Sequence, residues 1–551
     1  MKRLTIRFIS LFSLVTSITL SAAPTLIENV QGYHILPDKG LVTFSALAFE
    51  DGKVLATGDA SLLAKYPDAK RIDGQGKTLL PGLIDAHGHL LGLGDNLLQV
   101  ELREAKSAKD AVAKVAEYAK ANPDLPWIVG RGWNQVLWPG KQFPTAAQID
   151  TLIADKPVWL ERVDGHAAWV NSKALALAGI DKNTKDPAGG QIVRDAQGNA
   201  TGVLIDNAMP LVGKHLPKID DAARARALKA ATGHLLSLGI TSMHDAGIDH
   251  ETYHFYLDQA KANALGVRIY AMISAADPIL DKMLEKGHQH LQDDRLWIQS
   301  VKAFGDGALG SRGAALLAPY SDDKDNRGLL VTAEKDLAPL FEKVLGAGFQ
   351  LNYHAIGDRA NRLAMDNFSA AYKKVGGREL RNRVEHAQIV SPEDIPRFKT
   401  LDIIASMQPV HATSDMNMAG DRLGEERLQG AYAWQSFLKQ GTVVAAGSDF
   451  PVELANPFHG LYSAVTRQNH AGEPPGGWLP EEKLTLEQAF RAFTLDAAYA
   501  AHQENILGNL EAGKWADFIL IDRDIFNIDA STLWQTQVLQ TWLAGESVFQ
   551  H

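Results

Sequence analysis

The chain has 551 residues, of which 46% are hydrophobic and 22% charged, as in ordinary soluble globular proteins. A formal net charge of -10 leaves no basic excess for coating nucleic acid. The sequence has no cysteine, which excludes thiol nucleophiles, thiolate metal sites and disulfides. Any metal chemistry must therefore use histidine, carboxylate or lysine side chains.

Residues 1–23 have the order of a secretory signal peptide. Three basic residues within 1–7 precede an apolar stretch at 8–20, and small residues follow at 21–23. The apolar stretch is short for a membrane span, and an uncleaved anchor is the alternative interpretation. Because Pro24 disfavours a cut directly before it, the cleavage position stays open. We expect a periplasmic or secreted protein with no membrane attachment after signal removal.

Short β-strands are predicted at both ends of the mature chain. Near the N-terminus, strand-like segments alternate with Asp-Gly and Gly-Gln-Gly turns, at 25–30, 41–49, 54–57 and 71–80. Near the C-terminus, the strand-like segments are Phe518–Ile521 and 541–549, the latter with a Gly-Glu turn. Two β segments at opposite ends of one chain suggest a single small domain built from both.

A repeated strand–helix pattern fills the chain between these ends. Helical, amphipathic stretches occur at 222–238, 333–345, 358–374 and 486–501. Eight apolar strand-like segments alternate with helices, at 79–86, 239–244, 267–273, 297–304, 349–354, 382–386, 402–408 and 442–448. Eight strands alternating with helices predict a parallel (β/α)₈ barrel.

The interval between the first and second barrel strands is too long for a simple crossover. It contains strand-like segments at 127–131 and 157–163 and a Gly-rich, hairpin-like stretch at 189–206. We interpret residues from about 105 to about 220 as an α/β subdomain inserted over one face of the barrel.

Metal-binding side chains recur where the predicted barrel strands end. His87 and His89 lie two apart on strand one and point the same way, so both imidazoles can reach one ion. That pair alone is weak evidence. His354, His386 and Asp449 end strands five, six and eight, at the face where barrel active sites lie. Each alone is also compatible with a core histidine or a helix cap, but together they predict a metal centre.

Lys302 lies on the predicted fourth strand, and alternation places it on the same side as Phe304 and Asp306. A protonated lysine beside divalent cations is strongly disfavoured. Three interpretations stay open. Lys302 pairs with a carboxylate such as Asp306, or is an ordinary ion-paired lysine, or is carboxylated by CO₂ to become an anionic bridging ligand.

At this point the sequence resembles the amidohydrolase superfamily. The run at 81–89, Pro-Gly-Leu-Ile-Asp-Ala-His-Gly-His, is similar to the superfamily's opening signature. The segment at 508–518 is similar to the superfamily segment where the chain leaves the barrel and re-enters a composite β-sandwich. Four further motifs narrow the resemblance to the YtcJ-like branch, also called amidohydrolase family 3: Gly130-Arg131-Gly132-Trp133, Asp164-Gly165-His166, Lys302 with Asp306-Gly307, and His354 with Gly357-Asp358. The resemblance implies a composite β-sandwich of residues 24–80 plus 505–551 and a hydrolase barrel of residues 81–504.

The resemblance also implies roles for individual residues. It places His87, His89, His354, His386 and Asp449 around the metal, and it matches Lys302 to a carboxylated lysine that bridges two ions in binuclear relatives. Imidazole and carboxylate ligands suit zinc, with Mn²⁺, Fe²⁺ or Co²⁺ as alternatives and one ion or two left open. Asp449 is the expected general base and acid, and His354 or His386 is expected to help stabilise the oxyanion.

Several other residues are candidates for contacts with substrate. Trp133 and His166 come from the insertion, although local packing explains them equally well. His244 and Asp306 follow barrel strands two and four as further candidates. Weaker ones are Asp245, His411 and Asp415, of which the last two follow strand seven.

The expected activity is hydrolysis of an amide-type C–N bond, in an N-acyl, formamide or cyclic amide compound. Hydrolysis of an ester, carbamate or phosphoester on the same site is the first alternative. A non-catalytic extracytoplasmic binding or sensor protein is the second. The expected partner is a small-molecule substrate, a homodimer is left open, and the sequence does not name the substrate.

Overall fold

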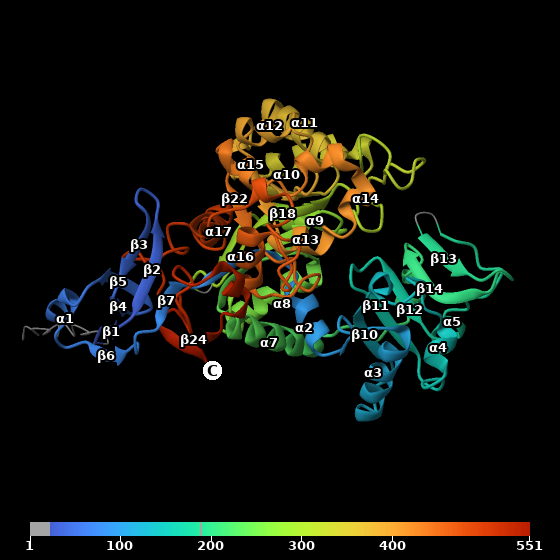
Figure 1. Cartoon of the computed structure of the whole chain (residues 1–551), viewed down its shortest axis with the longest axis horizontal. Coiled ribbons are helices and arrows are strands. Elements are labelled where there is room, and N and C mark those ends of the chain that lie inside the picture. Colours follow the sequence, from blue (N-terminus) through green and yellow to red (C-terminus); the bar gives the residue numbers. More distant parts are fainter. Residues whose placement is uncertain (1–22, 188–189, 292) are drawn as a thin grey trace, which may run out of the picture.

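The computed structural model describes residues 23–187, 190–291 and 293–551. The signal peptide predicted at 1–23 lies, except for its last residue, outside the described residues. Figure 1 shows a central barrel with a β unit from the chain ends on one side and an inserted sheet on the other. No helix in the described part of the chain is both long and apolar enough to cross a membrane.

The centre of the molecule is a (β/α)₈ barrel, which confirms the predicted fold class. Its strands are parallel and follow one another in chain order around the barrel. They are β8 (Leu83–Gly88), β15 (Ile240–Ile248), β16 (Arg268–Ser274), β18 (Leu296–Phe304), β19 (Gln350–Ala355), β20 (Arg383–His386), β21 (Ile404–Met407) and β22 (Val444–Ala446). The short β17 (Gln289–Leu291) pairs with β18 in the antiparallel sense.

The first and last strands close the barrel at their carboxyl ends. The amide of Asp449 donates to the carbonyl of His87, and the amide of His89 donates to that of Phe450, both at 2.8 Å. The buried carboxylate of Asp85 accepts hydrogen bonds from the hydroxyl of Ser448 at 2.6 Å and from its amide at 3.1 Å. This closure places the end of β8 beside the residues that follow β22.

Helices surround the barrel. In the long α11, buried residues recur at Ala360, Ala364, Phe368 and Ala371, so one stripe faces the strands. The predicted helix at 486–501 is divided into two. The barrel helices are α2 (Leu90–Leu97), α7 (Asp221–Ser237), α8 (His250–Lys261), α9 (Leu280–Glu285), α10 (Glu334–Gly346), α11 (Asp358–Val375), α12 (Ile395–Thr400), α13 (Pro409–Asp415), α14 (Ala419–Leu423), α15 (Trp434–Lys439), α16 (Pro457–Thr466), α17 (Leu486–Ala492) and α18 (Leu495–Ala500).

The insertion between β8 and β15 is a six-stranded sheet with short helices. Along β11, Val158 and Leu160 pack in one hydrophobic cluster and Trp159 in another, so both faces of the sheet are covered. Its strands, in spatial order, are β13 (Gly190–Arg194), β14 (Ala200–Asp206), β12 (Ala167–Val170), β11 (Val158–Arg162), β10 (Ile128–Trp133) and β9 (Val100–Glu101). Its helices are α3 (Ala108–Ala121), α4 (Ala146–Asp150), α5 (Ser172–Leu177) and α6 (Pro210–Gly213).

Strands from both chain ends share one six-stranded sheet, in the order β25 (Glu546–Gln550), β24 (Val538–Leu543), β23 (Phe518–Ile521), β7 (Thr78–Pro81), β2 (Gln31–Leu36) and β3 (Gly40–Phe44). A four-stranded sheet is formed by β5 (Lys53–Gly58), β4 (Ala46–Glu50), β1 (Thr25–Glu28) and β6 (Lys70–Asp73). Side chains of both sheets, such as Leu47 and Phe518, pack in one core. The structure divides the predicted strands at 41–49 and 71–80, divides the one at 79–86 between β7 and β8, and adds β2.

Candidate metal centre

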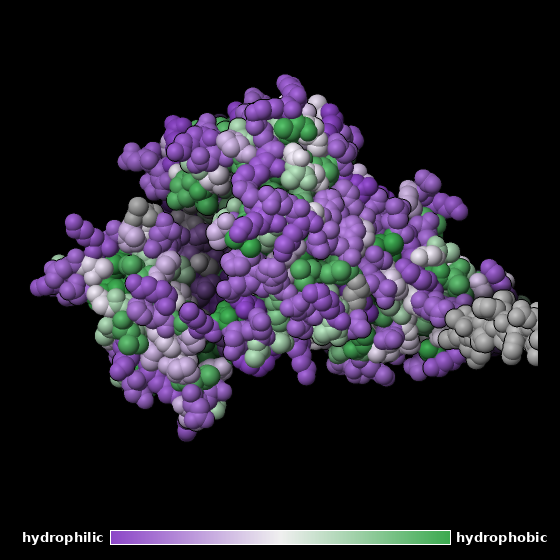
Figure 2. Space-filling view, turned by 180° about the vertical axis from the view of Figure 1, so that it is seen from behind, coloured by the Kyte–Doolittle hydropathy of each residue, from purple (hydrophilic) through white to green (hydrophobic). Residues whose placement is uncertain are grey.

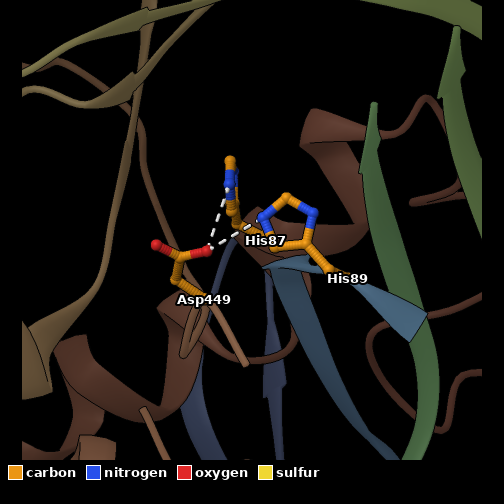
Figure 3. Close-up of side chains that lie close together, drawn as sticks. All are labelled: His87, His89 and Asp449. Atoms are coloured by element: carbon orange, nitrogen blue, oxygen red, sulfur yellow. Dashed lines mark ion pairs between the residues drawn. The ribbon is translucent and has the colours of Figure 1, made fainter. Parts of the chain in front are cut away.

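The predicted metal ligands meet at the carboxyl end of the barrel. Figure 3 shows Asp449 facing His87 and His89, with Oδ1 of Asp449 3.2 Å from Nε2 of His89 and 3.7 Å from Nε2 of His87. The ring centroid of His386 lies 4.7 Å from that of His87 and 4.6 Å from that of His354. Five side chains, from β8 and the residue after it, β19, β20 and the segment after β22, therefore surround one small space.

The backbone at two of these residues is left-handed. His386 has φ 74° and Asp449 has φ 62°, which residues other than glycine seldom adopt. On a regular strand, Glu385 and His386 would point to opposite faces, whereas here both are buried next to His87. Such conformations cost about 1–3 kcal/mol each, persist only where the surrounding structure holds them, and cluster at functional sites.

Hydrogen bonds to the outer ring nitrogens fix the orientation of two imidazoles. Nδ1 of His87 lies 2.5 Å from the carboxylate of Glu385, and Nδ1 of His386 lies 2.8 Å from the amide oxygen of Gln408. Both partners are acceptors, so they keep a proton on Nδ1 and leave the lone pair of Nε2 free. Among the described residues, the buried Nε2 of His87 has no hydrogen-bond partner. This is the arrangement of a metal-ligating histidine.

Glu385 is itself held by Arg383. The guanidinium places Nε 2.7 Å from Oε1 of Glu385 and donates from Nη2 to its Oε2 at 3.0 Å. It also donates to the carbonyl of Ala86 at 2.6 Å and to the hydroxyl of Ser406 at 2.7 Å. Both charged residues are fully buried. Despite burial, the charge of Arg383 and the hydrogen bond from His87 hold the pKa of Glu385 well below its usual range, so it is an anionic acceptor for His87.

The protonation states suit a cation. Burial, aided by the charge of Lys302, lowers the pKa of His87 to about 4, and burial also lowers the pKa values of His354 and His386 well below the usual range. These imidazoles are therefore neutral at pH 7, as ligation requires. Burial would raise the pKa of Asp449, but the hydrogen bond from His89 and the neighbouring histidines lower it overall. Three neutral imidazoles and a carboxylate fit a divalent ion such as zinc.

Lys302 lies on β18 and is buried near the same space. Burial lowers its pKa to about 8, against the opposing charges of Glu385 and Asp449. Its Nζ lies 4.3 Å from the ring centroid of Phe304. Asp306, the suggested partner, instead accepts hydrogen bonds from three backbone amides and lies 3.4 Å from Nε2 of His354.

The residues predicted to contact substrate are in different surroundings. Trp133 is fully buried in the insertion, where its indole donates to the carbonyl of Leu160. His166 is partly exposed and pairs with Asp206 at 2.8 Å. His244 lies beneath the centre, with Nδ1 2.9 Å from Arg383. The structure thus places Trp133 in a packing role, and His244 and Asp306 behind the ligands.

Figure 2 shows a hollow between the inserted sheet and the barrel. Arg103, just after β9, donates to the carbonyl of Pro451, two residues beyond Asp449. The same arginine lies beside Gly132 at the carboxyl end of β10. The carboxyl edge of the inserted sheet therefore adjoins the barrel mouth, and His166 follows β11 at that edge.

Arg383, Glu385, Gln388 and Gln408 are further residues of the site whose roles were not predicted from the sequence. One signal was available. Arg383 and Glu385 lie two residues apart on a predicted barrel strand and so point to the same side, and a charged pair inside a barrel must be paired and hydrogen-bonded. The two glutamines offered no such signal, since their roles depend on hydrogen bonds to His411 and His386. One ligand atom each of His386, His411 and Asp449 lie within 4.8 Å of one another, so His411 is near enough to the centre to reach an ion by distance alone.

This barrel, with histidines and a carboxylate at its strand ends, defines a metal-dependent hydrolase. Residues 70–549 match the Amidohydrolase family, and the chain belongs to that family. A solved structure described as an uncharacterized metal-dependent hydrolase from Pyrococcus horikoshii superposes with a TM-score of 0.77 at 28% identity, covering 92% of this chain and 99% of that one.

Curated relatives cover nearly the whole chain. Protein LONG AFTER FAR-RED 3 of Arabidopsis thaliana is 35% identical over 96% of this chain and 92% of its own length. Putative amidohydrolase YtcJ of Bacillus subtilis is 32% identical over 92% of this chain and 96% of its own, which confirms the YtcJ-like resemblance. N-substituted formamide deformylase of Arthrobacter pascens is 25% identical over 91% of this chain and 94% of its own.

Proposed function

We propose that the protein hydrolyses an amide-type C–N bond in a small N-acyl compound, with N-substituted formamides as the first class to test. The observation that carries the proposal is a set of metal-ligating atoms that face one space. Nε2 of His87 and of His386 each keep a free lone pair, because Nδ1 of each ring donates to an acceptor, and both lie next to the carboxylate of Asp449. The deformylase relative supports the bond type, since its name specifies that class of substrate.

His87, His89, His354, His386 and Asp449 would hold a divalent ion, which we propose to be zinc. When bound, such an ion supplies Lewis acidity and lowers the pKa of water towards neutrality. Asp449 is ionised at neutral pH and contacts His89, so it takes the proton from the attacking water and delivers it to the departing amine. Glu385 and Gln408 keep the two imidazoles oriented throughout.

We also propose that Lys302 is carboxylated when two ions are bound. Its pKa of about 8 leaves a substantial fraction of neutral amine at pH 7.5 to 8, and the neutral amine is the form that reacts with CO₂. The lysine is buried beside the charges of Glu385 and Asp449. Measurement of metal stoichiometry with and without bicarbonate tests this, and a Lys302→Met variant that keeps the same stoichiometry counts against it.

The experiment that tests the activity has two arms. Protein stripped with a chelator is reloaded with Zn²⁺, Mn²⁺ or Co²⁺ and assayed on N-formyl, N-acetyl, lactam, ester, carbamate and phosphoester compounds. We expect amide turnover to return with metal, and Asp449→Asn to bind metal while losing about 10²–10⁴-fold in kcat. Faster ester or phosphoester cleavage favours the alternative bond types, and a metal-loaded protein that releases every ligand unchanged favours a binding protein.

The proposed setting is outside the cytoplasm, after export by the residues at 1–23. Cell fractionation of the full-length chain and of a chain lacking those residues tests this. Equal recovery of both in the cytoplasm removes the proposal.

A further inference from the structure

His411 lies beside the general base but outside the predicted ligand set. It belongs to α13, directly after β21, and is only 7% exposed. Its Nε2 lies 3.7 Å from Oδ2 of Asp449, whereas His87 and His89 face Oδ1. Its ring runs nearly parallel to that of His386, with centroids 6.0 Å apart. His411 therefore borders the space above Asp449 from the side opposite to β8.

The hydrogen bond on its outer nitrogen has the opposite sense from those on His87 and His386. Nδ1 of His411 lies 2.9 Å from the amide nitrogen Nε2 of Gln388. An amide nitrogen can only donate, so Nδ1 accepts, and the neutral ring carries its proton on Nε2. Tyr432 contacts Gln388 at two points: its backbone amide donates to the main-chain carbonyl of Gln388 at 2.6 Å, and its hydroxyl lies 3.4 Å from the side-chain oxygen Oε1.

The N–H of Nε2 consequently points at the site without a lone pair to offer a metal. Among the described residues, Nε2 of His411 is buried and has no hydrogen-bond partner. A buried donor without an acceptor is costly, and such groups concentrate where a ligand supplies the missing acceptor. The candidate acceptor is an oxygen of the substrate, because Asp449 at 3.7 Å is too distant for a hydrogen bond.

We infer that His411 is a catalytic residue that donates from Nε2 to the carbonyl oxygen of the substrate, most strongly when that oxygen becomes an oxyanion. This inference rests on the proposed function. Water adds to the carbonyl carbon, and the C=O electron pair moves to the oxygen facing His411. The C–N bond then breaks, the amine leaves with the proton held by Asp449, and His411 keeps its own proton. Preorganised donors of this kind act mainly on kcat.

Two substitutions separate a donor from a metal ligand. His411→Leu removes the N–H, and we expect kcat to fall about 100-fold with little change in KM and unchanged metal content. In His411→Gln, the side-chain amide reaches the position of Nε2, so we expect most of that loss to be recovered. A leucine variant that loses metal in proportion to activity, or a glutamine variant no better than leucine, overturns the inference. The control is His290→Leu, which alters a histidine stacked on Trp297 at the opposite end of the barrel.

A change at Gln388 tests the proton position directly. Gln388→Glu replaces the donor with an acceptor, which draws the proton of His411 to Nδ1 and leaves Nε2 without one. We expect the loss in kcat to match that of His411→Leu with metal content unchanged. A glutamate variant with wild-type kcat overturns the inference.

A binding measurement tests the role of His411 independently of which bond the enzyme cleaves. Methylphosphonate, a tetrahedral oxyanion, is titrated calorimetrically into the zinc-loaded wild type and His411→Leu. We expect about tenfold weaker binding to the variant, the value of a hydrogen bond to a charged group. Equal binding overturns the role of His411. A wild type that binds methylphosphonate but cleaves no amide overturns the proposed function alone.

Discussion

Replacing Glu385 by glutamine tests whether the buried carboxylate organises the metal centre. The substitution keeps the shape of the side chain and removes its charge. Arg383, which is fully buried and contacts Glu385 at 2.7 and 3.0 Å, then lacks its anionic partner. Breaking a buried pair in this way costs about 3–5 kcal/mol of stability. We expect a loss near the lower end of this range, because Arg383 keeps its hydrogen bonds to the carbonyl of Ala86 and the hydroxyl of Ser406.

The same substitution weakens the metal site. The acceptor of the 2.5 Å contact with Nδ1 of His87 changes from a carboxylate to a neutral amide. Losing such an outer partner lowers metal affinity by about 10–100-fold, which corresponds to about 1.4–2.7 kcal/mol. The stability loss should appear in metal-free protein, and the affinity loss in zinc titrations against a competing chelator.

Urea unfolding of the metal-free protein measures the first quantity. Glu379→Gln, the same change at an exposed position four residues before the pair, is the matched control and should stay within about 0.5 kcal/mol of wild type. A Glu385→Gln protein with wild-type stability and zinc affinity would refute the reasoning that this buried pair supports His87.

Three further predictions concern other parts of the molecule. Burial lowers the pKa of His34 to about 4, and its Nδ1 accepts from the amide of Leu510, so folding favours the neutral ring. This preference contributes up to about 3 kcal/mol of stability, which is fully present above pH 6.5 and is lost as the pH falls towards 4. We expect the urea midpoint of His34→Asn to depend less on pH than that of the wild type. Gly447→Ala would place a methyl group 2.6 Å from Oδ1 of Asp85 and from the amide of His87; we expect a loss of about 1–3 kcal/mol with weaker zinc binding, and an unchanged zinc affinity would contradict this. Trp133→Ala should cost about 3–5 kcal/mol, because the side chain fills the insertion core, with KM unchanged in the folded fraction; a raised KM at full stability would instead support substrate contact.

Sequence patterns alone were enough to predict the barrel and the candidate metal-ligating residues at its strand ends. Local periodicity located all eight barrel strands, because buried parallel strands read as short apolar runs. The ligands were visible because each lies at or next to a strand end, such as His354 at the end of β19 and His386 at the end of β20. Boundaries were less accurate where one apolar run serves two sheets, as at 79–86, which β7 and β8 divide around Gly82.

The hydrogen-bond partners that orient these candidate ligands become apparent only in the folded chain. The partner of His87 comes from 298 residues away, and the partners of His386 and His411 come from other loops. A single sequence carries periodicity along the chain but no distances between distant segments. Two backbone conformations, the positive φ values of His386 and Asp449, also depend on surroundings rather than on local preference. For this reason the sequence left Trp133 between substrate contact and local packing, and it predicted no role for Glu385 or Gln388.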